Sequence, residues 1–324
     1  MAKISVYFND ASSRSMSGKL GKKLENYLYR HDIAFRSPES LNELHSSLAQ
    51  DVNEECEYIF SVGGDGTANT ILQNIQGTNV KLMVIPTGTA NDFASELGLN
   101  LNVDRIMKVF LHKTYQNVDV LKVNDKYMLT NGGIGMTSNV AEKINHDRKA
   151  IPGFKKLMKL TGSKIYPLYF GKEMIGPIKK YKLHIESKDF PYLQKEVSAA
   201  ILMINNQAKI GGNFLIAPET KNNDGKFNVT IFTHDSKLEL MKCTIMMMQG
   251  KYPQNDPNII SFETNEVDIT AIDEDMTFFG DGEVLQKGRS FLIKNIPQSL
   301  NVCSYDNQLL YCNSFSLDNV ELMR

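Results

Sequence analysis

The hydrophobic positions in the first third of the chain follow two different periods. Short β-branched runs at 4–8, 58–62 and 82–85 predict strands, because such side chains pack well on a pleated sheet. Between these runs, apolar residues recur three or four positions apart, which predicts helices. The helical positions are Leu20, Leu24, Tyr27, Leu41, Leu44, Leu48, Ile71, Leu72, Ile75, Phe93 and Leu97. Repeated strand, turn and helix units predict an α/β domain over residues 1–120, with a parallel sheet covered by helices.

From about Val118 the pattern changes to that of hairpins. Runs at 120–123 and 127–130 flank an Asn-Asp turn, and a mostly helical insert follows at about 140–175. Later strands are expected at 181–185, 197–204, 227–232, 267–272, 277–279 and 291–293. This pattern predicts a largely antiparallel domain over 121–302, a β-sandwich or else an open barrel, with the segment 303–324 packing back onto the first domain. The active site is expected in the cleft between the two domains.

Composition narrows the class of protein. With 42% hydrophobic and 23% charged residues, the 324-residue chain can bury one large core or two modest ones. The 36 basic and 37 acidic residues nearly cancel, which argues against a protein that coats nucleic acid. The four cysteines show no paired spacing, and no uncharged run is long enough to span a membrane. We therefore expect a soluble cytoplasmic protein with reduced thiols. The methionines at 246–248 are expected to fill gaps in a core helix.

The first candidate for chemistry is the run Gly63-Gly64-Asp65-Gly66-Thr67, which lies between a strand and a helix. Three glycines allow close approach of a ligand, and the start of the helix adds partial positive charge, so a phosphate fits there. The chain contains no GxxxxGK[ST] loop, and Asn69 replaces the third glycine of GxGxxG. A tight strand-to-helix turn without a ligand explains this run equally well.

A second turn, Thr87 to Phe93, also opens a helix at the end of a strand. If the two strands are neighbours, the hydroxyl and N–H of Thr89 lie beside the first glycine loop. The two loops bring Asp65 and Asp92 together, and these carboxylates would repel a polyphosphate unless a divalent cation such as Mg²⁺ lay between them. The arrangement predicts a magnesium nucleotide. Asp92 alone is also explained as a residue favoured by the helix dipole.

The two runs SVGGDGTANTI and VIPTGTANDFASELGL resemble the catalytic domain of diacylglycerol kinases, in the bacterial soluble lipid kinase branch. NAD kinases and phosphofructokinases share the GGDG turn, whereas GTxNDFA is typical of diacylglycerol kinases. The resemblance covers nearly the whole chain. It implies an enzyme that uses ATP and Mg²⁺ to phosphorylate the hydroxyl of diacylglycerol, giving phosphatidic acid.

The resemblance also implies which residues contact the nucleotide. At the N-terminus the family usually has Asn-Pro-x-Ser-Gly after the first strand, whereas this chain matches only in its Asn and Ser. A further departure is Thr70, where the family commonly has Glu. The implied nucleotide-binding residues are Asn9, Ser12, Ser37, Gly63, Gly64, Asp65, Gly66, Thr67, Thr89, Asn91 and Asp92.

In the second domain, the segment NQAKIGGNFLIAPETKNNDGKF resembles the part of the family that binds Mg²⁺. The resemblance implies a metal held by the Asp224 side chain and the carbonyls of Lys221 and Lys226, in addition to Asp65 and Asp92 near the nucleotide. By itself, Asn-Asp-Gly is a turn between strands. Asp119 matches an acidic family position that completes a water-mediated network around the metal, and an exposed hinge residue is the alternative.

The run Phe279-Gly280-Asp281-Gly282-Glu283 reads by itself as a hairpin turn. The family places its general base here. The resemblance therefore implies that Glu283 takes the proton of the lipid hydroxyl, and that Asp281 orients the site or joins the metal network. Asp65 is the third residue implied in catalysis.

The helical insert concentrates positive charge in an otherwise neutral chain. Between residues 143 and 182 there are eleven Lys or Arg residues and only two acidic ones, with apolar residues interleaved. This segment predicts peripheral attachment to anionic membranes, where a lipid substrate would be found. A solvated helix face is the alternative. A homodimer is a further expectation, and no nucleic-acid partner is expected.

Other functions remain open from the sequence. The acceptor could be a sphingosine-like lipid, a monoacylglycerol or a polyprenol, since relatives with similar patterns act on different lipids. A soluble substrate, as in NAD kinases, is disfavoured by the β-rich second domain and by the basic insert. A nucleotide-binding regulatory module without activity is suggested by Thr70 and the altered first loop, and disfavoured by the presence of Glu283.

Overall fold

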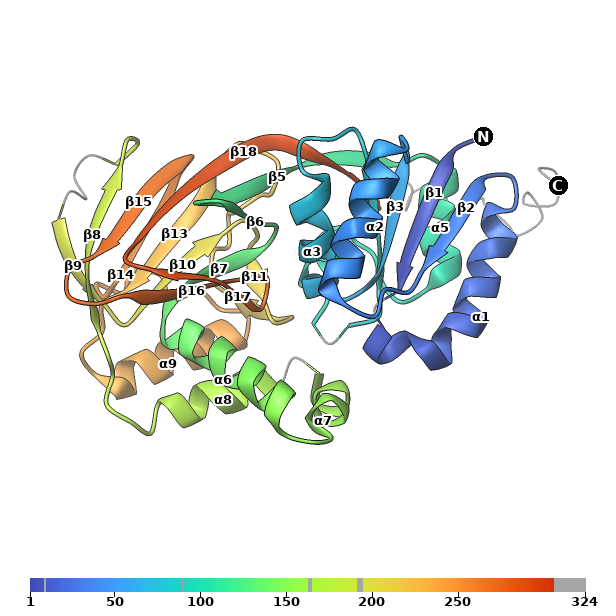
Figure 1. The fold of residues 1–324 in the computed structure, drawn as a ribbon. Coiled ribbons are helices and arrows are strands. Elements are labelled where there is room, and N and C mark those ends of the chain that lie inside the picture. Colours follow the sequence, from blue (N-terminus) through green and yellow to red (C-terminus); the bar gives the residue numbers. More distant parts are fainter. Residues whose placement is uncertain (9, 89, 163–164, 191–194, 306–324) are drawn as a thin grey trace.

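The protein consists of an α/β lobe and a β-rich lobe, on the right and left of Figure 1. Long strands connect the lobes at the top of this view. The structure is a computed structural model that describes residues 1–8, 10–88, 90–162, 165–190 and 195–305, with only the backbone described for 10–17, 155, 159 and 195.

The α/β lobe contains β1 (Lys3–Phe8), β2 (Asp32–Arg36), β3 (Tyr58–Gly63) and β4 (Lys81–Pro86). They form a parallel sheet in the order β2-β1-β3-β4. The helices are α1 (Asp10–Leu28), α2 (Leu41–Asn53), α3 (Asp65–Ile75), α4 (Asp92–Glu96) and α5 (Val103–Leu111). Nearly every residue of β1, β3 and β4 is buried, because helices cover the sheet. The predicted parallel-sheet α/β fold is confirmed.

The β-rich lobe contains the remaining strands. They are β5 (Tyr115–Val123), β6 (Lys126–Met128), β7 (Asn131–Gly135), β8 (Tyr181–Ser187), β9 (Lys195–Ala199), β10 (Ile201–Asn205), β11 (Lys209–Ile210), β12 (Phe214–Leu215), β13 (Phe227–Phe232), β14 (Ile259–Thr264), β15 (Glu266–Ala271), β16 (Met276–Gly280), β17 (Glu283–Gly288) and β18 (Ser290–Cys303). One antiparallel sheet has the order β14-β13-β10-β7-β16-β17, and it faces β18-β15-β8-β9. Phe227, Phe278 and Phe291 share the core between these sheets. The predicted antiparallel sandwich is confirmed.

Strand β18 belongs to both lobes. It pairs antiparallel with β15 and β5, and near its end Val302 lies opposite Leu82 of β4 in parallel register. After the end of β18, the N–H groups of Ser304 and Tyr305 donate to the carbonyls of Thr114 and Leu97 in the α/β lobe. The chain therefore returns to the first lobe through a strand. The predicted return of the C-terminal segment lies outside the described residues from 306 onward.

The single strand predicted for residues 197–204 is two strands in different sheets. β9 pairs with β8, whereas β10 pairs with β7 and β13. The change of sheet falls at Ala200, which is fully buried. The apolar run is continuous because both strands face the same sandwich core, so the pattern of hydrophobic residues alone does not reveal the break.

Four helices lie together on one side of the β-rich lobe, in the lower part of Figure 1. They are α6 (Met136–Ala150), α7 (Phe154–Thr161), α8 (Ile165–Glu173) and α9 (Lys237–Met248). The prediction that all three methionines of α9 pack in a core is wrong in part, because Met247 is buried while Met246 and Met248 are exposed. None of the helices in the described residues is long and apolar enough to cross a bilayer.

Candidate active site

The carboxyl ends of β3 and β4 carry the two glycine-containing loops. The strands place Gly63 opposite Pro86, and the Thr87 N–H donates to the Gly63 carbonyl at 2.8 Å. A Cβ atom added to Gly88 would lie 2.4 Å from the Cα of Gly64, so these two backbones touch and only glycine fits. The two loops therefore lie side by side, with the start of α3 directly after the first.

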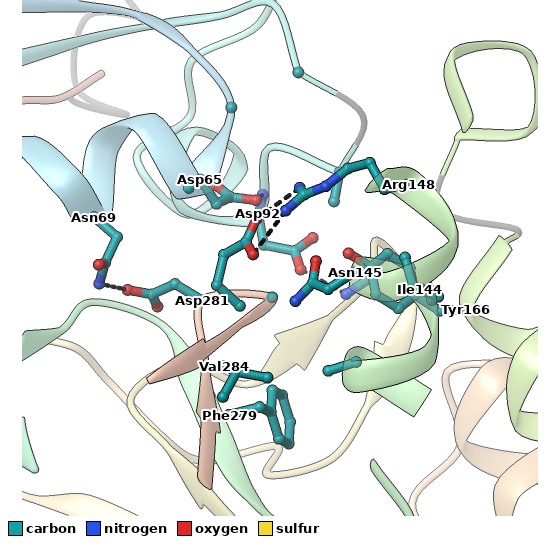
Figure 2. Close-up of a pocket in the computed structure, with 18 of the residues that line it drawn as sticks. Asp65, Asn69, Asp92, Ile144, Asn145, Arg148, Tyr166, Phe279, Asp281 and Val284 are labelled. Carbon is teal, nitrogen blue, oxygen red and sulfur yellow. Dashed lines mark hydrogen bonds and ion pairs between the residues drawn. The ribbon is translucent and has the colours of Figure 1, made fainter. Parts of the chain in front are cut away.

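Asp65 and Asp92 hold this region together. Asp65, the first residue of α3, accepts the backbone N–H groups of Asp92 at 2.9 Å and Phe93 at 3.1 Å. Asp92 in turn accepts the N–H groups of Gly211 at 2.6 Å and Gly212 at 3.0 Å, which belong to the β-rich lobe. Figure 2 shows Asp65 and Asp92 beside each other at the edge of the pocket. The first carboxylate fixes the second loop, and the second carboxylate fixes one lobe to the other.

The two carboxylates carry negative charge that is poorly compensated. Burial, and then the charge of Asp92, raises the pKa of Asp65 to about 7. Burial also raises the pKa of Asp92. Neither carboxylate forms an ion pair with a Lys or Arg among the described residues. Carboxylate oxygens are hard ligands, and each retains lone pairs beyond the hydrogen bonds above, so the pair fits Mg²⁺ bound directly or through water.

The raised pKa of Asp65 predicts a pH dependence of stability in metal-free protein. Because the folded state binds this proton more tightly than the unfolded state, the contribution of Asp65 is greatest below pH 4 and is lost as the pH rises to about 7. A shift of this size corresponds to at most about 4 kcal/mol. We expect the free energy of unfolding in EDTA to fall across this range, and the fall to be smaller in Asp65→Asn, as measured by urea denaturation. Equal slopes for both proteins would contradict the assignment.

Asp281 shapes the turn that carries Glu283. Asp281 and Gly282 both have positive φ, at 53° and 79°, and form a two-residue turn between β16 and β17. The buried Asp281 carboxylate accepts the N–H and the hydroxyl of Thr130, both at 2.7 Å, and the amide of Asn69 at 2.6 Å. Figure 2 shows the bond from Asn69 to Asp281. With the Leu129 N–H, four donors among the described residues surround Asp281, twice as many as bond to Asp65 or to Asp92, which favours an orienting role over metal binding.

Glu283 lies against the first glycine loop. A Cβ atom added to Gly66 would lie 3.4 Å from its Oε1. Arg148, in the last turn of α6, donates to both carboxylate oxygens of Glu283 at 2.7 and 2.9 Å. Figure 2 shows the Arg148 side chain reaching from its helix into the pocket. Sequence reasoning did not single out Arg148, because it appeared only as one of eleven basic residues in the insert.

One cavity of about 2190 Å³ connects the two glycine loops with the interior of the β-rich lobe. Its polar end is lined by Gly64, Asp65, Gly66, Thr67, Gly88 and Asp92. Its apolar end lies between the helices and the inner sheet and is lined by Val140, Ile144, Met158, Phe170, Met203, Ile216, Phe232, Met247, Phe279 and Leu285. Glu283 and Arg148 also line this cavity. The space is therefore large enough for two ligands, one polar and one apolar.

Several predicted nucleotide contacts lie elsewhere or cannot be placed. Asn91 has a positive φ of 56°, and its side chain bonds to the N–H and carbonyl of Gly88, so it supports the second loop. Ser37 is exposed just beyond β2 and does not line the cavity, although the next three residues do. Asn9 and Thr89 lie outside the described residues, and of Ser12 only the backbone, in α1, is described.

Asp119 and the turn at 221–226 form a separate cluster. Asp119 is buried; it accepts the Gly225 N–H at 2.7 Å, and its own N–H donates to the Asn222 carbonyl at 2.6 Å. Asp224 is exposed and accepts the Lys226 N–H at 3.1 Å. Lys221 is exposed in the same turn. These residues do not line the cavity. They come together as a group, apart from the cavity that Asp65 and Asp92 line.

Comparison with known proteins agrees with this architecture. The family pattern "Diacylglycerol kinase catalytic domain" matches residues 3–123, and the pattern "YegS C-terminal NAD kinase beta sandwich-like domain" matches residues 176–304. A Citrobacter koseri protein described as "Probable lipid kinase YegS-like" is 30% identical over 255 residues, which are 75% of this chain and 77% of that protein. The chain belongs to the YegS-like lipid kinase family. Escherichia coli K12 "Lipid kinase YegS" is 28% identical over 300 residues, covering 86% of this chain and 92% of that protein.

A solved structure shares the whole fold. The structure of a diacylglycerol kinase from Bacillus anthracis strain Sterne superposes with a TM-score of 0.68, at 17% sequence identity, over 94% of this chain and 97% of that one. At this identity the likeness concerns the fold. The family relationship identifies the chain as a lipid kinase family member, and the resemblance to diacylglycerol kinases expected from the sequence is confirmed at the level of the family.

Proposed function

We propose that this protein transfers the γ-phosphoryl group of ATP to the hydroxyl of diacylglycerol, giving phosphatidic acid, and that it requires Mg²⁺. The observation that carries this proposal is one cavity, which has the two glycine loops at one end and an apolar chamber at the other. Glu283 touches the first loop and lines the same cavity, so a hydroxyl on an apolar molecule can meet a bound triphosphate beside a carboxylate. A kinase for soluble substrates would have no use for the apolar end.

In this reaction the protein acts mainly by positioning the nucleotide and the lipid hydroxyl. The N–H groups at the start of α3 and the adjoining glycine loops bind phosphate oxygens. Asp65 and Asp92 would hold Mg²⁺, which supplies neutralisation of phosphate charge. Glu283 accepts the proton of the lipid hydroxyl as that oxygen attacks the γ-phosphorus and the bond to the β-phosphate oxygen breaks, leaving ADP. Asp281 holds the Glu283 turn against α3 through Asn69.

The alternatives differ in what the apolar chamber would hold. A sphingosine-like lipid, a monoacylglycerol or a polyprenol would use the same loops and the same base. A regulatory module without activity was suggested by Thr70, but the Thr70 hydroxyl donates to the Gly66 carbonyl at 2.9 Å and so stays within α3. This substitution leaves Asp65 and Glu283 in position, which supports an active enzyme.

A lipid panel tests the proposal. Purified protein is incubated with γ-labelled ATP, Mg²⁺ and detergent micelles that contain diacylglycerol, monoacylglycerol, sphingosine, a polyprenol or no lipid, with NAD as a soluble acceptor. We expect label in phosphatidic acid and none without lipid or with EDTA. Transfer to another lipid only would reassign the acceptor, transfer to NAD would favour the soluble-substrate alternative, and transfer to none would overturn the proposal.

Arg148 gives a separate prediction about how the base is held. The guanidinium orients both oxygens of Glu283, and lysine cannot reproduce this fork-shaped contact. We expect kcat to fall about 10-fold in Arg148→Lys and about 100-fold in Arg148→Ala, while the free energy of unfolding changes by less than about 1 kcal/mol because the pair is partly exposed. Steady-state kinetics with thermal unfolding measures both. A kcat equal to that of the unaltered protein in both variants would contradict the orienting role.

We also propose that the protein is cytoplasmic and meets its lipid at the membrane surface. The support is the excess of basic residues in the segment 143–182, which includes α7 and α8. In the described residues, Lys156 and Lys172 of this segment are exposed and form no ion pair. Attraction to an anionic surface is worth roughly 1 kcal/mol per basic residue near it.

A further inference from the structure

An unusual share of exposed apolar side chains gathers on α7, α8, α9 and their flanking residues. More than half of the large exposed hydrophobic residues in the described chain lie there, including Leu160 at 86% and Ile175 at 81% exposure. The complete set is Ile151, Leu157, Leu160, Leu168, Ile175, Leu238, Met241, Ile245, Met246 and Met248. Apolar patches of this kind on a protein surface mark sites of interaction.

Helix α9 carries apolar residues on two faces. Leu240, Cys243 and Met247 are buried against the lobe. Leu238, Met241 and Ile245 are exposed at 55%, 42% and 46%, and their spacing of three and four residues places them in one stripe on the solvent side. A helix that only covered a core would have a polar outer face. We therefore expect a partner to cover this stripe. The stripe could not be identified from the sequence, because the buried and the exposed faces of α9 are both apolar.

The helices form one continuous surface. Phe170 of α8 and Met174, the residue after this helix, pack against the core cluster that contains Leu240 and Met247 of α9. Met158 of α7 likewise shares a cluster with the start of α8. The Lys237 ammonium also donates to the Ile175 carbonyl at 3.3 Å, which ties the start of α9 to the end of α8. Figure 1 shows these helices on the same side of the β-rich lobe.

This surface borders one opening of the cavity. Met248 of α9 and Ile151, between α6 and α7, both line the cavity and are both exposed, at 40% and 48%. The cavity therefore meets solvent beside this surface, as it also does at Leu41 of α2, which lines it and is 64% exposed. An acyl chain that left a bilayer in contact with this surface would enter the chamber without crossing water.

The charge of this surface indicates which kind of partner covers it. Residues 151–175 and 237–251 together contain eight Lys and two Glu. Lys242 and Lys251 of the second segment are exposed and form no ion pair among the described residues. In a twofold dimer of this chain the patch would meet itself and bring these positive charges together, which is unfavourable. An anionic bilayer provides both the apolar layer and the opposite charge.

We propose that α9 is a membrane-binding helix, whose stripe of Leu238, Met241 and Ile245 inserts into the boundary between headgroups and acyl chains of an anionic bilayer and places the adjacent opening of the cavity on that bilayer. This assignment rests on the proposed function, since only an enzyme with a lipid substrate needs a path from the bilayer into the cavity. It extends the membrane contact beyond the basic segment to an apolar helix. None of the three residues lines the cavity.

Vesicle binding of a triple variant, Leu238→Gln, Met241→Gln and Ile245→Gln, tests the proposal. Vesicles of phosphatidylcholine with about one-third phosphatidylglycerol are sedimented with the full-length protein. We expect the partition coefficient to fall about 10- to 100-fold, because three half-exposed apolar side chains no longer insert. The matched control, Leu101→Gln with Leu111→Gln, removes apolar side chains of similar exposure, 56% and 47%, from the α/β lobe and should change binding less than 2-fold.

Activity measurements separate this proposal from the proposed function. With short-chain diacylglycerol in detergent micelles, the triple variant should keep kcat within 2-fold, because its residues are outside the cavity. Loss of activity in all proteins, including the unaltered one, would defeat the proposed function and leave the vesicle result standing. Vesicle binding of the triple variant equal to that of the unaltered protein would overturn membrane insertion by α9. A change from dimer to monomer in the triple variant, seen by analytical ultracentrifugation, would also overturn it.

A second variant avoids any loss of folding. The chain contains no Trp, so Met241→Trp introduces a unique fluorophore on the stripe. We expect its emission to shift to the blue on addition of anionic vesicles and to be quenched by brominated acyl chains. Leu101→Trp on the α/β lobe should show neither effect. Emission of the Met241→Trp variant that stays unchanged while the protein sediments with vesicles would place the contact elsewhere and contradict the proposal.

Discussion

Glu283→Gln is expected to lower kcat for lipid phosphorylation by about 10² to 10⁴, the range that a general base contributes. Gln keeps the shape of the side chain and can still bond to Arg148, but it cannot accept the proton of the attacking hydroxyl. The Kd for magnesium ATP should change less than 3-fold, because Gln fills the same space beside Gly66 as Glu283 does. Rapid-quench kinetics for kcat and isothermal titration calorimetry for the nucleotide Kd measure the two quantities.

The control for this variant is Glu263→Gln, an exposed carboxylate on β14 away from the cavity, which should leave kcat unchanged. If Glu283→Gln retained a kcat within 2-fold of the unaltered protein, Glu283 would not be the base. If instead nucleotide binding were lost as well, its role would be structural.

Gly88→Ala should disrupt the nucleotide site without touching any charged group. Its Cβ would lie 2.4 Å from the Gly64 Cα and 2.9 Å from Asn91 Oδ1, so the two loops must separate. Overpacking of this kind costs about 1–3 kcal/mol, which, if lost from nucleotide binding, raises the Kd for magnesium ATP about 5- to 150-fold. Gly64→Ala, whose nearest contact is the Gly88 Cα at 3.1 Å, should have a smaller effect.

Gly288→Ala is the matched control, because a Cβ atom there meets nothing within 4 Å. Calorimetric titration of the three variants with magnesium ATP measures the series. Equal nucleotide affinity in Gly88→Ala and Gly288→Ala would show that contact between the loops does not shape the binding site.

The sequence predicted the fold where local pattern and tertiary structure agree. Strands β1, β3 and β4 could be predicted because both of their faces are buried and most of their residues are apolar, whereas the edge strand β2, which is partly exposed, was not predicted. The turn at Asp281 and Gly282 could be predicted because Asp-Gly pairs adopt the positive φ angles that a two-residue hairpin turn requires. Strand β7, Asn131–Gly135, was not predicted because glycine disfavours strands. Its glycines are required, however, since a Cβ atom on Gly133 would lie 2.0 Å from the Leu202 carbonyl oxygen.

Some residues of the candidate site could also be identified from the sequence, and others could not. Asp65 and Glu283 stand in recognisable motifs, so they could be identified from sequence. Arg148 could not, because its contact with Glu283 joins residues that are 135 positions apart and depends on how α6 packs on the sandwich. The exposed face of α9 was missed for a related reason. Apolar residues are usually buried, and only the structure distinguishes Met247, which is buried, from Met241, which is not.

The most direct test of the account is a crystal structure with Mg²⁺ and a non-hydrolysable ATP analogue. We predict that the triphosphate lies on the glycine loops at the start of α3, that Mg²⁺ lies beside Asp65 and Asp92, and that the γ-phosphate faces Glu283. A triphosphate bound away from α3, or a Glu283 side chain separated from the γ-phosphate by the body of the nucleotide, would contradict the account.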